Sequence, residues 1–135
     1  MRALALPLIL LPLASCGGAP ATRIVKGPLG ITAEITERIN GGTVSNRLNV
    51  ALRSPRSSKK VEIFSGSGGS DADVVFDGKL VIVQYCLPNH YEITSYVYSI
   101  GDDFAYSDIR VAAATTDSHI GKRRFCSPSD GNART

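Results

Sequence analysis

Residues 74–83 read Val-Val-Phe-Asp-Gly-Lys-Leu-Val-Ile-Val, two apolar runs on either side of Asp77-Gly78. An Asp-Gly pair between hydrophobic runs is typical of a two-residue hairpin turn of type I′, because glycine tolerates the positive φ that this turn requires. The second run continues through residue 87 and is apolar on both phases of a strand, apart from Gln84. Such a strand is covered on both faces, so we expect 80–87 to be a central strand that Pro88 stops.

Most of the remaining chain also favours strands. Apolar and polar residues alternate with a period of two at 31–36, 48–53, 91–100 and 109–113, and 61–64 is a short apolar run. This period is typical of strands with one face in the core and one face in water. Asn40-Gly41-Gly42 predicts a turn, and the glycine-serine run at 65–70 predicts a flexible loop.

These elements predict an all-β protein, a small antiparallel β-sandwich or curled sheet of about seven strands. No segment downstream of residue 16 has a convincing helical period. We assign 23–126 to a single β-domain, a size that one core can serve. The polar residues 127–135 are expected to form a disordered tail.

The N-terminal residues have a different character. Arg2 precedes an apolar run from Ala3 to Leu13, which contains Pro7 and Pro12. A helix that spans a bilayer needs roughly 20 apolar residues, so this run is too short to be one. A positive residue, an apolar run and small residues before a cleavage point are typical of an export signal, which we assign to 1–15.

The sequence Leu13-Ala14-Ser15-Cys16 at the end of this run resembles the lipobox of bacterial lipoproteins. The resemblance implies that Cys16 carries a diacylglyceryl group, that the chain is cut before it, and that 16–22 tethers the domain to a membrane facing the periplasm. By analogy with enteric lipoproteins, Gly17 in place of aspartate favours the outer over the inner membrane. The alternative is an ordinary secretory signal in which the cysteine is accidental.

Lipid on Cys16 leaves Cys86 and Cys126 as an even pair. In an oxidising compartment such a pair predicts a disulfide. The alternative is a two-cysteine metal site with His90 and His119, but the chain has no Cys-x-x-Cys and its histidines lack a finger-like spacing. We therefore expect no metal and no other cofactor.

The spacing of the candidate catalytic and ligand-binding residues matches no specific motif. Carboxylates spaced in loops can hold calcium, but the aspartates here lack the spacing of an EF-hand, and their preference for turns also explains their positions. These aspartates are Asp71, Asp73, Asp102, Asp103 and Asp108. The glycine-serine run lacks the ending of a phosphate-binding loop. Ser65 or Ser67 could act as a nucleophile with His90 or His119, but no nucleophile elbow surrounds them. We therefore expect a protein that is not an enzyme, and keep a hydrolase as the less favoured alternative.

Two groups of side chains are candidates for a binding surface. Tyrosines combine an apolar body with a polar tip, which suits a binding face, and Tyr91, Tyr96 and Tyr98 cluster in the second half. Lys122, Arg123 and Arg124 could meet anionic envelope components, although a solvated loop is the favoured explanation because three charges make a small patch.

The overall charge helps to limit the partners. Without Arg2 the chain has 14 basic against 12 acidic residues, so its charge does not suggest nucleic acid. We expect a membrane-anchored envelope module that binds a partner or has a structural role. The alternative from a different class is an inhibitor or immunity-type protein against an envelope-directed hydrolase, which rests on architecture alone.

Overall fold

The computed structural model describes residues 19–39, 45–56, 60–98 and 109–127. Within these ranges the chain is all-β, as expected, with a single 3-10 turn at Pro28–Gly30. The described residues contain no helix with the length and apolar character needed to cross a bilayer. The signal peptide, the turn at 40–42 and the residues that follow Ser127 lie outside the described ranges.

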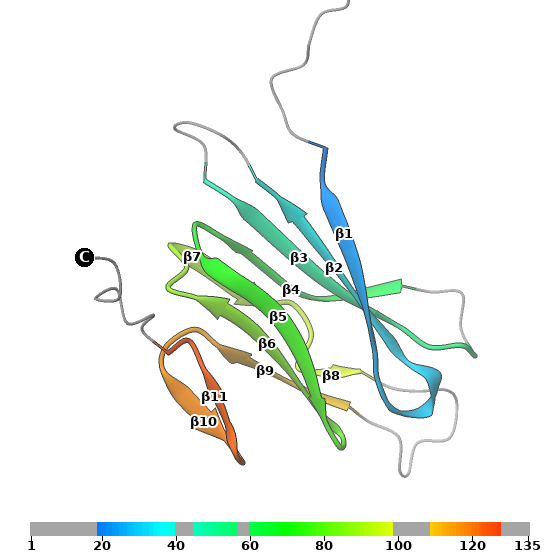
Figure 1. Ribbon diagram of the computed structural model, residues 1–135. Helices are drawn as coiled ribbons and strands as arrows, with labels where there is room; N and C mark the ends of the chain where they lie inside the picture. Colours follow the sequence, from blue (N-terminus) through cyan, green and yellow to red (C-terminus); the bar gives the residue numbers. More distant parts are fainter. Residues whose placement is uncertain (1–18, 40–44, 57–59, 99–108, 128–135) are drawn as a thin grey trace, which may run out of the picture.

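The larger of two facing sheets has five strands in the described chain, all antiparallel to their neighbours. Its order in space is β1-β2-β3-β4-β7 (Figure 1). The strands are β1 (Ala21–Lys26), β2 (Thr32–Arg38), β3 (Arg47–Arg53), β4 (Lys60–Ser67) and β7 (His90–Ile93). The predicted tether, 16–22, therefore overlaps β1 by two residues.

The facing sheet has four strands in the order β5-β6-β9-β8 (Figure 1). They are β5 (Ser70–Asp77), β6 (Leu80–Cys86), β8 (Val97–Tyr98) and β9 (Ile109–Ala114). The pair β6–β9 is parallel, in contrast to the antiparallel pairing that we expected. Parallel neighbours need a crossover connection, and here the chain crosses to the other sheet as β7 before it returns as β8.

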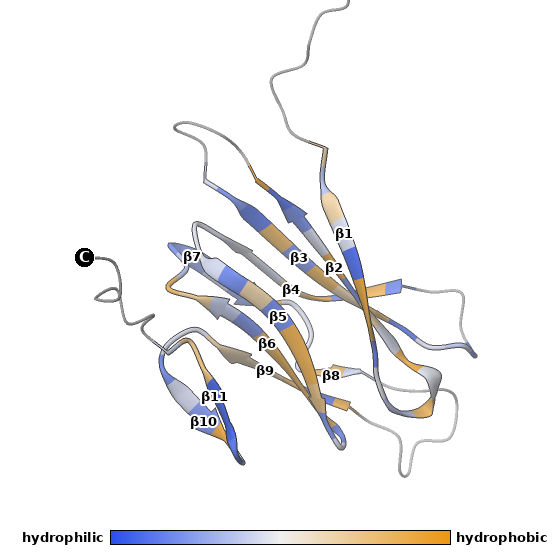
Figure 2. Cartoon of the chain, viewed as in Figure 1, coloured by the Kyte–Doolittle hydropathy of each residue, from blue (hydrophilic) through white to orange (hydrophobic). Residues whose placement is uncertain are grey.

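The main hydrophobic core lies between the two sheets. β2 and β3 contribute alternate residues, such as Ile35 and Val50, while their intervening residues, polar except for Ala51, face outward. Figure 2 shows this alternation as colour bands along β3, whereas β5 has one continuous hydrophobic stretch before its last residue. The period of two in the sequence thus predicts correctly which face of β2 and β3 is buried.

The central strand β6 is buried on both faces, as predicted. Val81 and Val83 pack into the main core, and Ile82 packs into a second cluster on the opposite face. A separate hairpin, β10 (Ser118–Ile120) and β11 (Arg123–Phe125), covers that outer face with Phe125 (Figure 1). The sequence predicts no strand at 115–126, so the hairpin is a finding of the structure.

A disulfide joins the hairpin to β6 and confirms the predicted pair. Cys86 and Cys126 have Cα atoms 5.2 Å apart and are separated by 40 residues in sequence. Because Cys126 directly follows β11, the bond holds the hairpin against the outer face of the four-stranded sheet.

Two sequence-based predictions of local structure need correction. The β5–β6 turn consists of Gly78 and Lys79, one residue later than Asp77-Gly78, because Asp77 already pairs with Leu80. Of the two turn residues only Gly78 has a positive φ, which is the requirement of a II′ turn and not of I′. The predicted strand 91–100 is broken into β7 and β8, which belong to different sheets.

The glycine-serine run at 65–70 is mostly strand and not the predicted flexible loop. Ser65–Ser67 belong to β4 and Ser70 begins β5, which leaves Gly68 and Gly69 as the connection. The aromatic ring of Tyr85 lies against Gly66 and Gly69, where an added Cβ would approach ring atoms to 2.9 and 2.8 Å. The glycines are therefore present because the ring occupies the space of a side chain.

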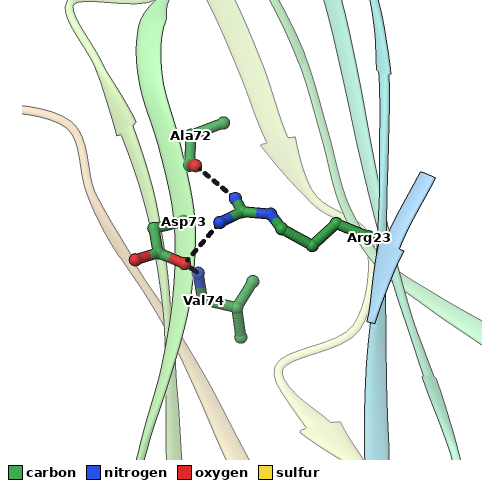
Figure 3. A network of polar contacts seen from close by, with 4 residues as sticks. All are labelled: Arg23, Ala72, Asp73 and Val74. Carbon is green, nitrogen blue, oxygen red and sulfur yellow. Dashed lines mark hydrogen bonds and ion pairs between the residues drawn. The ribbon is translucent and has the colours of Figure 1, made fainter. Parts of the chain in front are cut away.

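An arginine bridges the two sheets at the side of the sandwich where β1 and β5 are the edge strands. Arg23 Nη2 donates to the carbonyl of Ala72 at 2.7 Å, and Arg23 Nη1 lies 3.4 Å from Asp73 Oδ1 (Figure 3). The same carboxylate oxygen accepts a hydrogen bond from the Val74 amide at 2.8 Å. This network fixes β1 relative to β5, although exposed ion pairs stabilise a fold by less than about 1 kcal/mol each.

Replacing both Cys86 and Cys126 with serine should lower the free energy of unfolding by about 2–4 kcal/mol, because the crosslink restricts the unfolded chain. Urea unfolding of the oxidised protein and of the double variant measures the difference. Hydrogen exchange should show the largest loss of protection in β10 and β11. A Cys16→Ala variant is the matched control, and a loss of stability as large in that variant would contradict the assignment of the effect to the disulfide.

Replacing Gly66 with alanine should lower the free energy of unfolding by about 1–3 kcal/mol, because the new methyl group collides with the Tyr85 ring in a packed core. Ser67→Ala, on the adjacent outward-facing position of β4, should change it by less than about 0.5 kcal/mol. Thermal unfolding of both variants tests the pair. Equal stability of Gly66→Ala and the parent protein would show that the packing of the Tyr85 ring does not require glycine at position 66.

Candidate functional site

The outer face of the five-stranded sheet has an open groove of about 330 Å³ near the ends of β3, β4 and β7. Its lining consists mainly of small or charged polar side chains. The lining residues are Arg47, Leu48, Asn49, Glu62, Ser65, Gly66, Ser67 and His90. This outer face has no covering layer among the described elements, in contrast to the outer face of the four-stranded sheet.

Strand register explains how these residues come together. Arg47 pairs with Ser67, and Ser67 pairs with His90, so the three lie in one row across β3, β4 and β7. Directly opposed residues of antiparallel strands place their side chains on the same face. Arg38 of β2 pairs with Arg47 and extends the row by one strand. We call the residues Arg38, Arg47, Ser67 and His90 the outer row.

The charges of the outer row are not neutralised within the described chain. Neither Arg38 nor Arg47 forms an ion pair with a described residue. The acid that lines the groove, Glu62, accepts a hydrogen bond from Asn49 Nδ2 at 3.0 Å. The outer row therefore presents two arginine side chains to solvent beside a serine hydroxyl and an imidazole, a set that suits an anion with oxygen acceptors.

The candidate nucleophile and base of the sequence analysis are partly brought together. Ser67 and His90 are cross-strand neighbours, and Ser65 also lines the groove. His119 lies on β10, in the separate hairpin. No hydrogen bond between the Ser67 hydroxyl and His90 occurs in the described structure. The pair thus has proximity but not the linked donor and acceptor geometry of a catalytic triad.

The candidate tyrosines do not form one surface. Tyr98 is only 4% exposed and belongs to the main core, so it cannot contribute to a binding face. Tyr91 stacks on Phe64 with ring centroids 5.9 Å apart, at the edge of the core. Tyr96 is 66% exposed and lies next to β8, near the start of β6 and far from the groove along the strands.

The candidate basic residues lie on the hairpin. Arg124 forms two hydrogen bonds with Asp117, from Nε at 2.9 Å and from Nη2 at 2.6 Å. These bonds hold the pKa of Asp117 below its usual range and raise the pKa of Arg124. Lys122 and Arg123 line a cavity of about 250 Å³ between the hairpin and β5–β6, with an apolar floor that includes Ile82.

A smaller cavity of about 180 Å³ opens at the end of the sandwich between the sheets, where Tyr85 forms its inner wall. The Tyr85 hydroxyl donates to the carbonyl of Asn46 at 3.4 Å. Burial raises the pKa of this tyrosine, and the charge of Glu37 acts in the same direction. The phenol is therefore a neutral, structural donor and is not activated for chemistry.

The candidate calcium ligands are only partly within the described ranges. Asp73 forms an ion pair with Arg23, and Asp71 is exposed in the bulge of β5. Asp102, Asp103 and Asp108 lie outside the described residues. Among the described residues, no three histidine, cysteine, aspartate or glutamate side chains gather in a way that could hold a metal ion.

The outer row contains residues that carry no distinguishing signal in the sequence. Arg38 and Arg47 are the polar phase of two alternating strands, and nothing in their local sequence separates them from other surface arginines. Only the pairing of β2, β3, β4 and β7 brings them beside Ser67 and His90. The whole chain matches no protein-family model, no curated protein and no solved structure in the comparisons made.

Proposed function

We propose that this protein is a lipid-anchored binding module of the bacterial cell envelope. Its anchor is lipid on Cys16, its domain faces the periplasm, and the outer membrane is favoured over the inner. The outer row and its groove form the binding site. The domain is a binding protein and not an enzyme.

The pairing of the cysteines carries this proposal. The chain contains three cysteines, and two of them form the Cys86–Cys126 disulfide. A structural disulfide is typical of proteins outside the cytosol. The remaining cysteine is Cys16, at the end of the sequence that resembles a lipobox. A lipid with two or more acyl chains there would be a sufficient membrane anchor without any helix.

The form of the groove supports binding over catalysis. It is open, its serine and histidine are not linked by a hydrogen bond in the described structure, and its arginine forms no ion pair with a described residue. A site of this kind can hold an anionic group by charge and hydrogen bonds without activating a nucleophile. The groove also lies on a regular sheet, where the register fixes the spacing of its side chains.

Cys16→Ala should abolish incorporation of a clickable palmitate analogue when the protein is expressed in a Gram-negative host. The parent protein should be labelled and should fractionate with membranes, because its anchor is the acylated thiol. The double variant Cys86→Ser/Cys126→Ser is the matched control and should still be labelled, since those sulfurs carry no lipid. Equal labelling of Cys16→Ala and the parent would contradict the proposal.

A further inference from the structure

The outer row lies at the end of the domain that is closest to Cys16. β1 begins at Ala21, and Ala21 pairs with Glu37, the residue before Arg38. Four residues separate Cys16 from Ala21, and an extended chain covers at most about 3.5 Å per residue, so the two are within about 17 Å. If Cys16 carries the lipid, as the proposed function requires, this end of the five-stranded sheet must lie close to the bilayer surface.

The charge at this end differs from the charge at the opposite end of the same strands. Arg38 and Arg47 face each other across β2 and β3, and like charges in directly opposed positions destabilise a sheet. At the other end of β3, Arg53 faces Lys60 in the same way, but Lys60 Nζ lies 3.0 Å from Glu34 Oε1. The cation pair near the tether has no such carboxylate among the described residues.

The acidic residue next to Arg38 lies on the opposite face of β2. Glu37 pairs with Leu48, which is buried, and therefore belongs to the inward phase of β2. Together with Asp71 it lines the cavity at the end of the sandwich, which Arg38 and Arg47 also line, and it does not line the groove of the outer face. The outermost row of the outward face is thus cationic, and the acids of the same face, Glu62 and Glu92, lie in rows farther from the tether.

Exposed apolar side chains accompany the cations. Ile39 directly follows Arg38 and is 64% exposed, and Leu87, directly after β6, is 74% exposed. Leu87 belongs to the same end, because Asn89 N donates to the carbonyl of Ser67 at 2.9 Å. Arginines beside exposed aliphatic residues are typical of protein surfaces that bind the interface of an anionic bilayer.

We propose that the tether end binds the anionic lipid head groups of the membrane that holds the anchor. Arg38 and Arg47 contact lipid phosphates, with Ser67 and His90 as further hydrogen-bonding groups, and Ile39 enters the interface. The lipid and the outer row then act as two attachments of one domain to one surface. The end that carries Tyr96 and Val97 faces away from the membrane.

The absence of tryptophan from the chain provides a clean test. Ile39→Trp places the only tryptophan at the tether end, and Val97→Trp places it at the opposite end, on a residue that is 48% exposed. Each mature lipidated variant is reconstituted in nanodiscs of phosphatidylglycerol or phosphatidylcholine with brominated acyl chains, which quench tryptophan on contact. In phosphatidylglycerol, quenching should be several-fold stronger for Ile39→Trp than for Val97→Trp.

The arginines are tested in the Ile39→Trp background. Arg38→Gln together with Arg47→Gln should reduce the quenching in phosphatidylglycerol to the level seen in phosphatidylcholine, and high salt should have a similar effect because it screens the attraction. Arg53→Gln is the matched control, since it removes an exposed arginine from the other end of β3 and should leave the quenching unchanged. Circular dichroism and the urea midpoint confirm that each variant is folded.

Equal quenching at positions 39 and 97 would overturn the proposed orientation. Strong quenching of Ile39→Trp that persists after both arginines are replaced, or that is equal in the two lipids, would overturn the role of the anionic head groups. Intact mass of the same samples reports the lipid on Cys16 independently. A chain without lipid refutes the proposed function, and quenching of that processed chain by added brominated phosphatidylglycerol vesicles then decides the membrane contact separately.

Discussion

Strand β6 is stable in this fold only if both of its faces are kept from water. Val81 and Val83 require the five-stranded sheet on one side, and Ile82 requires a cover on the other. Full burial of each such side chain contributes about 1.5–3 kcal/mol, which is large compared with the net stability of a small domain. A two-layer sandwich leaves Ile82 in water, so the chain needs a third layer over the four-stranded sheet.

The third layer is too small to be stable without help. β10 and β11 have three residues each, and an isolated two-stranded hairpin is at best marginally stable in water. Phe125 provides the apolar contact with the sheet. The Cys86–Cys126 disulfide reduces the conformational entropy that the chain would gain if the hairpin detached from the sheet. The disulfide is therefore needed where the hydrophobic contact is smallest, between the central strand and its thin cover.

The sequence predicts the elements whose side chains are sorted by burial, and fails where a tertiary contact sets the residue type. β2, β3 and β6 were predictable because their apolar phases report one or two buried faces. β1 was missed because it is an exposed edge strand, and β11 because most of its residues are polar. Gly66 resembles a linker glycine until Tyr85 is seen to occupy the space of its side chain.

The same limit applies to the candidate site. Ser67 and His90 could be named from their chemistry, but their adjacency depends on the pairing of β4 with β7. The broken strand at 91–100 and the parallel β9 follow from one crossing of the chain between the sheets, for which no local signal exists. Both incorrect predictions concern long-range strand pairing. A period of two in the sequence indicates only which face of a strand is buried, and does not indicate which strand lies beside it.

The two sheets therefore have different roles. The outer face of the four-stranded sheet is occupied by the hairpin, because β6 is apolar on both sides. The outer face of the five-stranded sheet carries polar residues on β2, β3 and β4 and is stable in water without a cover. A surface that is stable when uncovered can hold unpaired cations at fixed spacing until a ligand meets them. Because the apolar outer face of the four-stranded sheet is covered by the hairpin, the open groove and the outer row lie on the five-stranded sheet.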